Sequence, residues 1–309
     1  MKSSLVAAAL FLPLAFVLGC TGTGDGGKGD PLHSPHADKL GDGAKLADVL
    51  GPATWLDPDD TDSASCSSPA ATSVYVTGVT VVAVDRFDET GNGQRGNFYV
   101  EDTSVEPVEY SGATVFAPSF SPPDLRLAEG DVADVNGALQ EFLGPSSGKF
   151  GSCKTLPELS GTLSFRLENG TRTPKAIKLD ELKSYETARK WLGMLVKLEP
   201  LEGANTLVVT SDPSMGCQKG GGACVASGDC CSTSCVDKVC SSMRYQANLD
   251  VGAGVKQSDV PKISNELYDI EVEGPALVMG AQFKSITGIV TYFYGFHIAP
   301  RSKDDFELP

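Results

Sequence analysis

The sequence predicts a mainly β protein, built as two small β-barrels in tandem with a disulfide-rich insertion in the second. Short segments of β-branched and aromatic residues alternate with glycine-containing turns through residues 72–142. A similar succession of segments recurs between residues 191 and 308, and six cysteines fall within residues 217–240. β-Branched and aromatic residues favour strands, and a meander of short strands with glycine turns is typical of small barrels.

The N-terminal residues predict export. Lys2 is followed by an apolar run from Leu5 to Leu18, which is too short to span a bilayer but suits a signal-peptide core. The run ends in Val-Leu-Gly-Cys at Cys20, which resembles the lipobox of bacterial lipoproteins. The resemblance implies that residues 1–19 are a signal peptide and that Cys20 is acylated, with palmitate as a typical chain. The alternative is an ordinary signal peptide that contains a cysteine.

Residues 20–45 are expected to form a lipidated flexible tether. They consist mostly of Gly, Asp, Ser and Pro and offer almost nothing to bury. Thr21 follows the anchor cysteine, whereas Asp at this position retains many lipoproteins in the inner membrane. The resemblance therefore implies an outer-membrane location, on the periplasmic or the surface face, with the lipid anchor as the membrane partner.

The charge and the cysteine count narrow the class of protein. Removing Lys2 with the signal leaves 24 basic and 40 acidic residues, a net charge of 24 − 40 = −16, which opposes nonspecific binding to nucleic acid.

The number of cysteines suits an oxidising compartment. Of nine cysteines, assigning Cys20 to lipid leaves eight, an even number that can all form disulfides. Cys66 and Cys153 flank the first predicted domain, and we predict that they form a disulfide joining its first and last segments.

The segment 217–240 has the cysteine spacing C-x6-C-x5-C-C-x3-C-x4-C. Spacing alone leaves fifteen connectivities open, and so small a unit needs cross-links because it has no core. The adjacent cysteine pair resembles the knottin pattern, which implies the disulfides Cys217–Cys231, Cys224–Cys235 and Cys230–Cys240. A metal site is the alternative, although the segment has no C-x-x-C pair and no histidine.

The first predicted domain carries a family resemblance. Its expected strands are 72–84, 97–102, 114–116 and 132–142. The pattern VTGVTVVAV, GNFYVED, GATVFAP and LAEGDVADVNGALQEF over residues 70–155 resembles the OB-fold-like domains that accompany secreted bacterial nucleases of the endonuclease/exonuclease/phosphatase group. The resemblance implies an OB-like barrel with an accessory role.

A second OB-like copy is expected to follow. Further expected elements are a strand at 161–168, a short helix near 179–190, strands at 191–199, 205–210 and 243–249, and a closing hairpin within 286–308. This register places the cysteine-rich insert at a hairpin tip, where insertions are tolerated. The predicted domains are 46–160 and 161–309, the latter containing the insert 217–240.

The sequence gives no sign of a catalytic site. His33 and His36 lie in the tether, and His297 stands alone on the last predicted strand. A metal-dependent nuclease site needs several convergent carboxylates and usually a histidine, and GxSxG, GxxxxGK[ST] and GxGxxG motifs are all lacking. We therefore expect a non-enzymatic protein with no catalytic residues, cofactor or metal ion.

A few residues are candidates for ligand or ion binding. The residues Tyr292, Tyr294 and Phe296 would share one face of a strand, where aromatic rings can bind oligomers by stacking, but packing within the hairpin's own core is the favoured interpretation. Arg301 is also a candidate because it belongs to the family's closing turn, although an ion pair fastening the C-terminus is expected there.

Two acidic segments could hold a cation. These are residues 57–62 and 85–89, but a solvated loop and a β-turn are the favoured interpretations.

The expected function is that of a cell-envelope lipoprotein whose OB-like domains bind a polymer or a protein. Oligosaccharide, single-stranded nucleic acid and an envelope protein are the candidate partners. The alternatives are a nucleic-acid-binding accessory protein of a secreted nuclease and a structural envelope spacer. The oligomeric state does not follow from the sequence.

Overall fold

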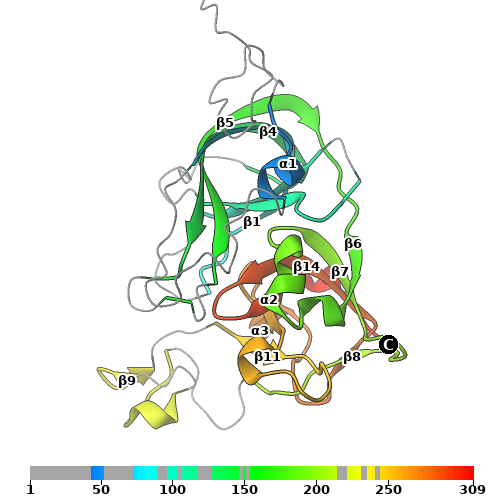
Figure 1. Ribbon diagram of the computed structural model, residues 1–309. Helices are drawn as coiled ribbons and strands as arrows, with labels where there is room; N and C mark the ends of the chain where they lie inside the picture. Colours follow the sequence, from blue (N-terminus) through cyan, green and yellow to red (C-terminus); the bar gives the residue numbers. More distant parts are fainter. Residues whose placement is uncertain are drawn as a thin grey trace, which may run out of the picture.

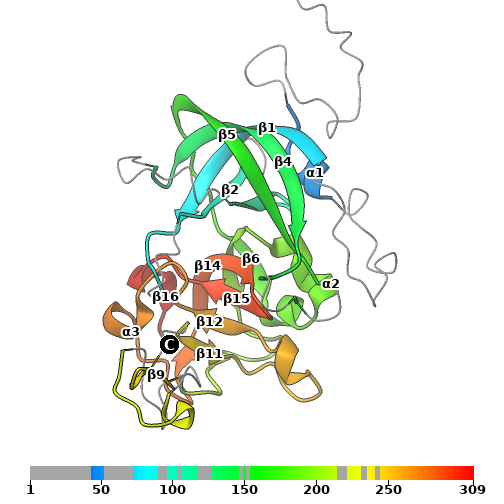
Figure 2. The same ribbon diagram turned by 90° about the vertical axis from the view of Figure 1, so that its left-hand side faces the viewer.

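The structure consists of two β units, one stacked on the other (Figures 1 and 2). It is a computed structural model that describes residues 43–51, 72–89, 96–103, 106–116, 127–145, 149–150, 154–213, 221–230, 235–240 and 244–309. Strands predominate and the described helices are all short, which confirms the mainly β class. None of these helices has the length and apolarity needed to cross a membrane. The predicted signal peptide, Cys20, Cys66, Cys153, His33, His36 and the acidic segment 57–62 lie outside the described residues.

The first unit closes into a barrel, as predicted, and the barrel has five strands in the order β1-β2-β3-β5-β4. Its elements are α1 (Leu46–Leu50), β1 (Thr72–Val84), β2 (Phe98–Asp102), β3 (Gly112–Val115), β4 (Asp131–Phe142) and β5 (Leu156–Asn169). Successive side chains of β2 alternate, so that Phe98 and Val100 belong to the barrel core while Tyr99 packs with residues of the second unit.

The barrel is longer than the sequence predicts. β5 pairs with β4 from Leu156 to Asn169, and it also runs parallel to β3. The expected domain boundary between residues 160 and 161 therefore falls inside a barrel strand. The first unit continues to Asn169 because β5 pairs with β4 along its whole length.

The second unit is an open seven-stranded sheet where the sequence predicts a second barrel. The described strands follow the order β11-β12-β15-β14-β7-β6, with β16 paired to β14. Their bounds are β6 (Lys175–Lys178), β7 (Leu195–Glu199), β11 (Gln246–Asn248), β12 (Lys262–Ser264), β14 (Ser285–Tyr292), β15 (Phe296–Ala299) and β16 (Phe306–Glu307).

Short helices, rather than closure of the sheet, complete the core of the second unit. Leu179, Leu182, Tyr185 and Trp191 come from three consecutive helical turns and are buried in the same core as the sheet residues. These turns are η4 (Leu179–Leu182), α2 (Tyr185–Ala188) and η5 (Arg189–Trp191), in the region where a short helix is predicted. The other short helices of the unit are η7 (Gln257–Asp259), α3 (Ile270–Glu273) and η8 (Lys303–Asp305).

The cysteine-rich insert leaves the second unit at a hairpin, as predicted. β8 (Leu207–Val208) pairs with β13 (Gln282–Phe283), and the chain beyond β8 runs antiparallel to the residues that follow β11. Thr210 N donates to Asn248 O at 2.9 Å, and Asp250 N donates to Val208 O at 2.8 Å. The insert contains η6 (Ser227–Asp229), β9 (Cys235–Val236) and β10 (Val239–Cys240).

The two units touch through their backbones at Gly112 and Gly193. A Cβ on Gly112 would lie 2.8 Å from Gly193 C and 2.5 Å from Met194 Cγ. A Cβ on Gly193 would lie 2.6 Å from Ala113 C, and Gly193 has φ +75. The outer face of β3 can therefore meet the second unit only because both positions lack a side chain.

We predict that Gly193→Ala destabilises the protein more than Gly203→Ala. Both glycines have a left-handed φ, but a Cβ at Gly203 would meet nothing within 4 Å. Gly203→Ala should lower the free energy of unfolding by about 1 kcal/mol, and Gly193→Ala by about 2–4 kcal/mol because overpacking is added to strain. Urea denaturation of both variants measures the difference. Equal losses would contradict the close contact.

Candidate functional site

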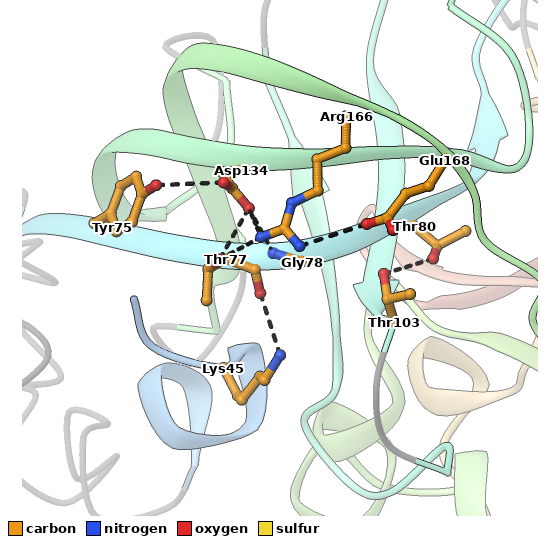
Figure 3. Close-up of polar contacts among 9 residues, drawn as sticks. All are labelled: Lys45, Tyr75, Thr77, Gly78, Thr80, Thr103, Asp134, Arg166 and Glu168. Atoms are coloured by element: carbon orange, nitrogen blue, oxygen red, sulfur yellow. Dashed lines mark hydrogen bonds and ion pairs between the residues drawn. The ribbon is translucent and has the colours of Figure 1, made fainter. Parts of the chain in front are cut away.

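A polar cluster around Asp134 braces the barrel (Figure 3). The carboxylate of Asp134 on β4 accepts hydrogen bonds from Gly78 N at 2.7 Å, Thr77 Oγ1 at 2.9 Å and Arg166 Nη2 at 2.6 Å. Burial alone would raise the pKa of Asp134, but the hydrogen bonds from Gly78, Arg166 and Thr77 lower it. Since the charge of Asp134 is matched by Arg166 and its donors come from β1 and β5, the cluster fastens three strands together.

The outer face of β2 and β3 is covered by the second unit. Tyr99 is 6% exposed and packs with Leu195, Leu267 and Ile289. Glu101 accepts a hydrogen bond from Leu195 N and pairs with Arg172 Nε at 3.0 Å. Sequence alternation places Phe98 and Tyr99 on opposite sides of β2, and neither ring is available to a ligand in this arrangement.

A second group of charged residues is buried where the barrel meets the sheet. We call it the junction cluster, and its members are Asp85, Glu89, Tyr99, Arg244, Glu266, Thr291 and His297. Arg244 Nε lies 2.9 Å from Glu89 Oε1, and Arg244 Nη1 contacts Glu266 Oε1. His297 Nδ1 donates to Glu266 Oε1 at 3.0 Å, and Thr291 Oγ1 donates to Glu266 Oε2 at 2.5 Å.

The surroundings of the junction cluster shift the pKa values of two of its acids, Glu266 and Asp85, in opposite directions. Burial alone would raise the pKa of Glu266, but Arg244, His297 and Thr291 lower it to about 2. Burial raises the pKa of Asp85 to about 8, and repulsion from Glu89 and Glu266 adds to the effect. Burial also lowers the pKa of His297, although Glu266 opposes this. At neutral pH Glu266 is therefore charged and His297 is neutral.

The junction cluster is enclosed rather than open to a substrate. His297 is fully buried, and the side chain of Glu266 is 7% exposed. His297 stands alone in the sequence, and no motif links it to Glu266 or Arg244. The arrangement can hold the two units together by charge, and it explains why a histidine occupies the interior of β15.

The aromatic candidates do not form a common face. β14 ends at Tyr292 and β15 begins at Phe296, so that these two residues pair across a hairpin and are 4% and 3% exposed. Tyr294 lies in the turn between them with φ 56 and is 43% exposed. Its ring contacts Phe150 at a centroid distance of 5.2 Å. Tyr292 and Phe296 thus pack in the core of the second unit, and the expected continuous strand through residue 296 is wrong.

Arg301 has the structural role that its turn predicts, and it also reaches the barrel. Arg301 Nη2 pairs with Asp305 Oδ1 at 3.1 Å, and Arg301 N donates to Asp305 Oδ2 at 2.7 Å. Arg301 Nη1 donates to Val82 O at 3.2 Å and pairs with Glu129 Oε2 at 3.0 Å. The side chain therefore fastens the C-terminal turn to β1 and to the residues before β4.

The described part of the cysteine-rich insert contains two of the three disulfides that the knottin resemblance implies. Cys224 is bonded to Cys235, and Cys230 to Cys240. Cys217 and Cys231 lie outside the described residues. The sulfur atoms of Cys224, Cys230 and Cys240 lie within 4.8 Å of one another, but all three are in disulfides and none is a thiolate that could bind a metal.

The insert also exposes apolar side chains. Val225, Val236 and Val239 are 96%, 58% and 45% exposed, and Val236 is paired with Val239 across the β9–β10 hairpin. The disulfides rather than these valines stabilise the insert, because its buried cluster consists of cysteines. The three valines therefore place exposed apolar surface on the described part of the insert.

No family model matches the chain, and no curated protein matches it. Functional inference for this chain therefore depends on its own sequence and geometry.

We predict that Glu266→Gln destabilises the protein strongly at neutral pH, whereas Glu307→Gln does not. Glu266→Gln removes the charge of one of the two carboxylates that pair with Arg244. Because breaking a buried ion pair leaves the remaining charge without compensation, the free energy of unfolding should fall by about 3–5 kcal/mol. Glu307 is 51% exposed beside Lys197, so solvent screens this ion pair and Glu307→Gln should change the free energy of unfolding little.

The effect of Glu266→Gln should depend on pH. The pKa of Glu266 is lowered in the folded state, so its contribution is present above pH 4.5 and is lost as the pH falls toward 2. The difference between wild type and variant in urea denaturation should shrink over this range. A difference that stays constant would show that the charge of Glu266 is unimportant.

Proposed function

We propose that this protein is a lipid-anchored cell-envelope protein that presents its cysteine-rich insert to a protein partner. One observation carries the proposal: the disulfide-braced insert exposes three valines, two on the β9–β10 hairpin and one, Val225, just before η6. Fully burying one valine side chain contributes roughly 1.5–3 kcal/mol, so these residues could supply a substantial part of a binding energy. A hairpin held by disulfides also loses little conformational entropy when it binds.

The position of the insert supports this proposal. In Figures 1 and 2, α1 lies on the barrel and β9 lies at the opposite end of the molecule. A tether before residue 46 would attach the barrel end to a membrane. The insert would then face away from that membrane, where a partner can reach it.

The barrel supports a scaffold role in this proposal. Its closed order β1-β2-β3-β5-β4 agrees with an OB-like fold, in which the outer face of the second and third strands commonly binds oligonucleotides or oligosaccharides. Here Glu101, Tyr99 and Gly112 of that face contact the second unit. A partner at the insert is therefore favoured over a nucleic acid or an oligosaccharide on the barrel.

We predict that the mature protein begins at Cys20 and carries acyl chains there. The apolar run before Cys20 and its lipobox-like ending motivate this expectation. Intact mass spectrometry of the membrane fraction should show loss of residues 1–19 and added lipid. Cys20→Ala should release the protein from the membrane fraction, and an unprocessed N-terminus in the wild type would defeat the anchor.

The partner can be tested by crosslinking in cells. A photoreactive amino acid at position 236 should give one discrete adduct, whereas the same group at position 272 should not. Val272 is the matched control because it is 77% exposed but lies on α3 of the body.

The substitution Val225→Asp should abolish the adduct from position 236, because a charge would have to be buried next to the partner. Identical adducts from positions 236 and 272 would contradict the proposal. Absence of adducts from both positions would instead favour the structural spacer.

A further inference from the structure

The junction cluster has an excess of acid over base. Asp85, Glu89 and Glu266 supply three carboxyl groups, and Arg244 is the only guanidinium that contacts them in the described residues. Asp85 Oδ1 and Glu89 Oε2 are both buried and have no hydrogen-bond donor within the described chain. Buried carboxyl oxygens without a donor are uncommon in native proteins, because each loses its hydration without compensation.

The charges that face Asp85 come from both units. Glu89 follows it on the same loop, and Tyr99 faces it from β2. Arg244 precedes β11, and Glu266 follows β12. These groups are joined by His297 on β15, which contacts Glu266, and by Lys262 on β12, which acts on His297.

We propose that Asp85 keeps a proton at neutral pH, and that loss of this proton in alkaline solution weakens the contact between the barrel and the second sheet. A proton on Asp85 makes its buried Oδ1 part of a neutral carboxyl group, which costs less to bury than a carboxylate without a donor. Its removal leaves three negative charges at the junction facing one guanidinium. Since Asp85 follows β1 while Arg244 and Glu266 belong to the second unit, the added repulsion acts across the contact.

The direction of the effect follows from linkage. Asp85 has a raised pKa in the folded state, from 3.8 to about 8. Its contribution to stability is therefore fully present below pH 3.8 and is lost as the pH rises toward 8. Glu266 acts in the opposite sense at low pH, so the two acids would give the junction a limited pH range of maximum stability.

Weakening of the junction would also affect the position of the insert. The barrel is the part nearest the tether, and the second sheet carries the insert. A weaker junction would let the insert move relative to the barrel. This consequence rests on the proposed function, but the proton at Asp85 does not.

Hydrogen exchange measured by NMR tests the proposal on the full mature chain. Tyr110 N donates to Lys190 O at 2.8 Å, and this backbone hydrogen bond links the two units. Protection of the Tyr110 amide, corrected for intrinsic exchange, should fall by about tenfold or more between pH 6 and pH 9 in the wild type, a factor that corresponds to one pKa unit of coupling. Asp85→Asn cannot lose the proton and should remove most of this fall.

Two further variants keep the test decisive. Glu89→Gln removes the partner carboxylate and should also reduce the fall, so the test survives if Asp85→Asn does not fold. Glu109→Gln is the control, because Glu109 pairs with Lys190 across the same junction but is 53% exposed. Glu109→Gln should leave the pH-dependent fall in protection of the Tyr110 amide unchanged.

Two results would overturn the proposal. One is equal pH dependence in wild type, Asp85→Asn and Glu89→Gln. The other is full restoration of wild-type protection at pH 9 by millimolar Ca²⁺, because this would assign the two oxygens to a cation rather than to a proton. Far-ultraviolet circular dichroism that is unchanged at both pH values, together with the expected fall, would distinguish a weakened junction from global unfolding.

Discussion

The close contact between the outer face of β3 and the second sheet is the constraint on which the remaining architecture depends. Gly112 and Gly193 allow the backbones to meet, and Tyr99 and Glu101 are buried as a result. Once this face is covered, the polar groups at its margin lose their hydration and need partners. Arg172 therefore pairs with Glu101, and the ionisable residues around Glu266 are gathered at the junction.

Local sequence patterns predict the parts of the fold that local chemistry determines. β1 coincides with the predicted strand 72–84, because its β-branched residues are uninterrupted by helix formers. The disulfides Cys224–Cys235 and Cys230–Cys240 are two of those that the knottin resemblance implies, although cysteine spacing alone leaves fifteen connectivities open. The position of the insert between β8 and β11 follows from the same local information.

Long-range pairing is what the sequence does not reveal. The second unit stays open because the helical turns with Leu182, Tyr185 and Trp191 complete its core, and no periodicity in the sequence distinguishes this from a closed barrel. Arg244, Glu266 and His297 come from separate elements, so no motif could join them. Even Tyr292 and Phe296, four residues apart, are separated by a turn that depends on the left-handed conformation of Tyr294.

The covered face also determines where a partner can bind. An OB-like barrel that uses its own second and third strands to hold another unit cannot offer them to an oligomer as well. The insert is then connected to the barrel through the second unit. Arg301 strengthens the contact between the two units because it links Val82 and Glu129 to the C-terminal turn. A preorganised insert reduces the entropy lost on binding only if the body that carries it is itself rigid. In the proposed function, the strength of the junction would therefore contribute to binding at the insert, although the junction lies in the body and not in the insert.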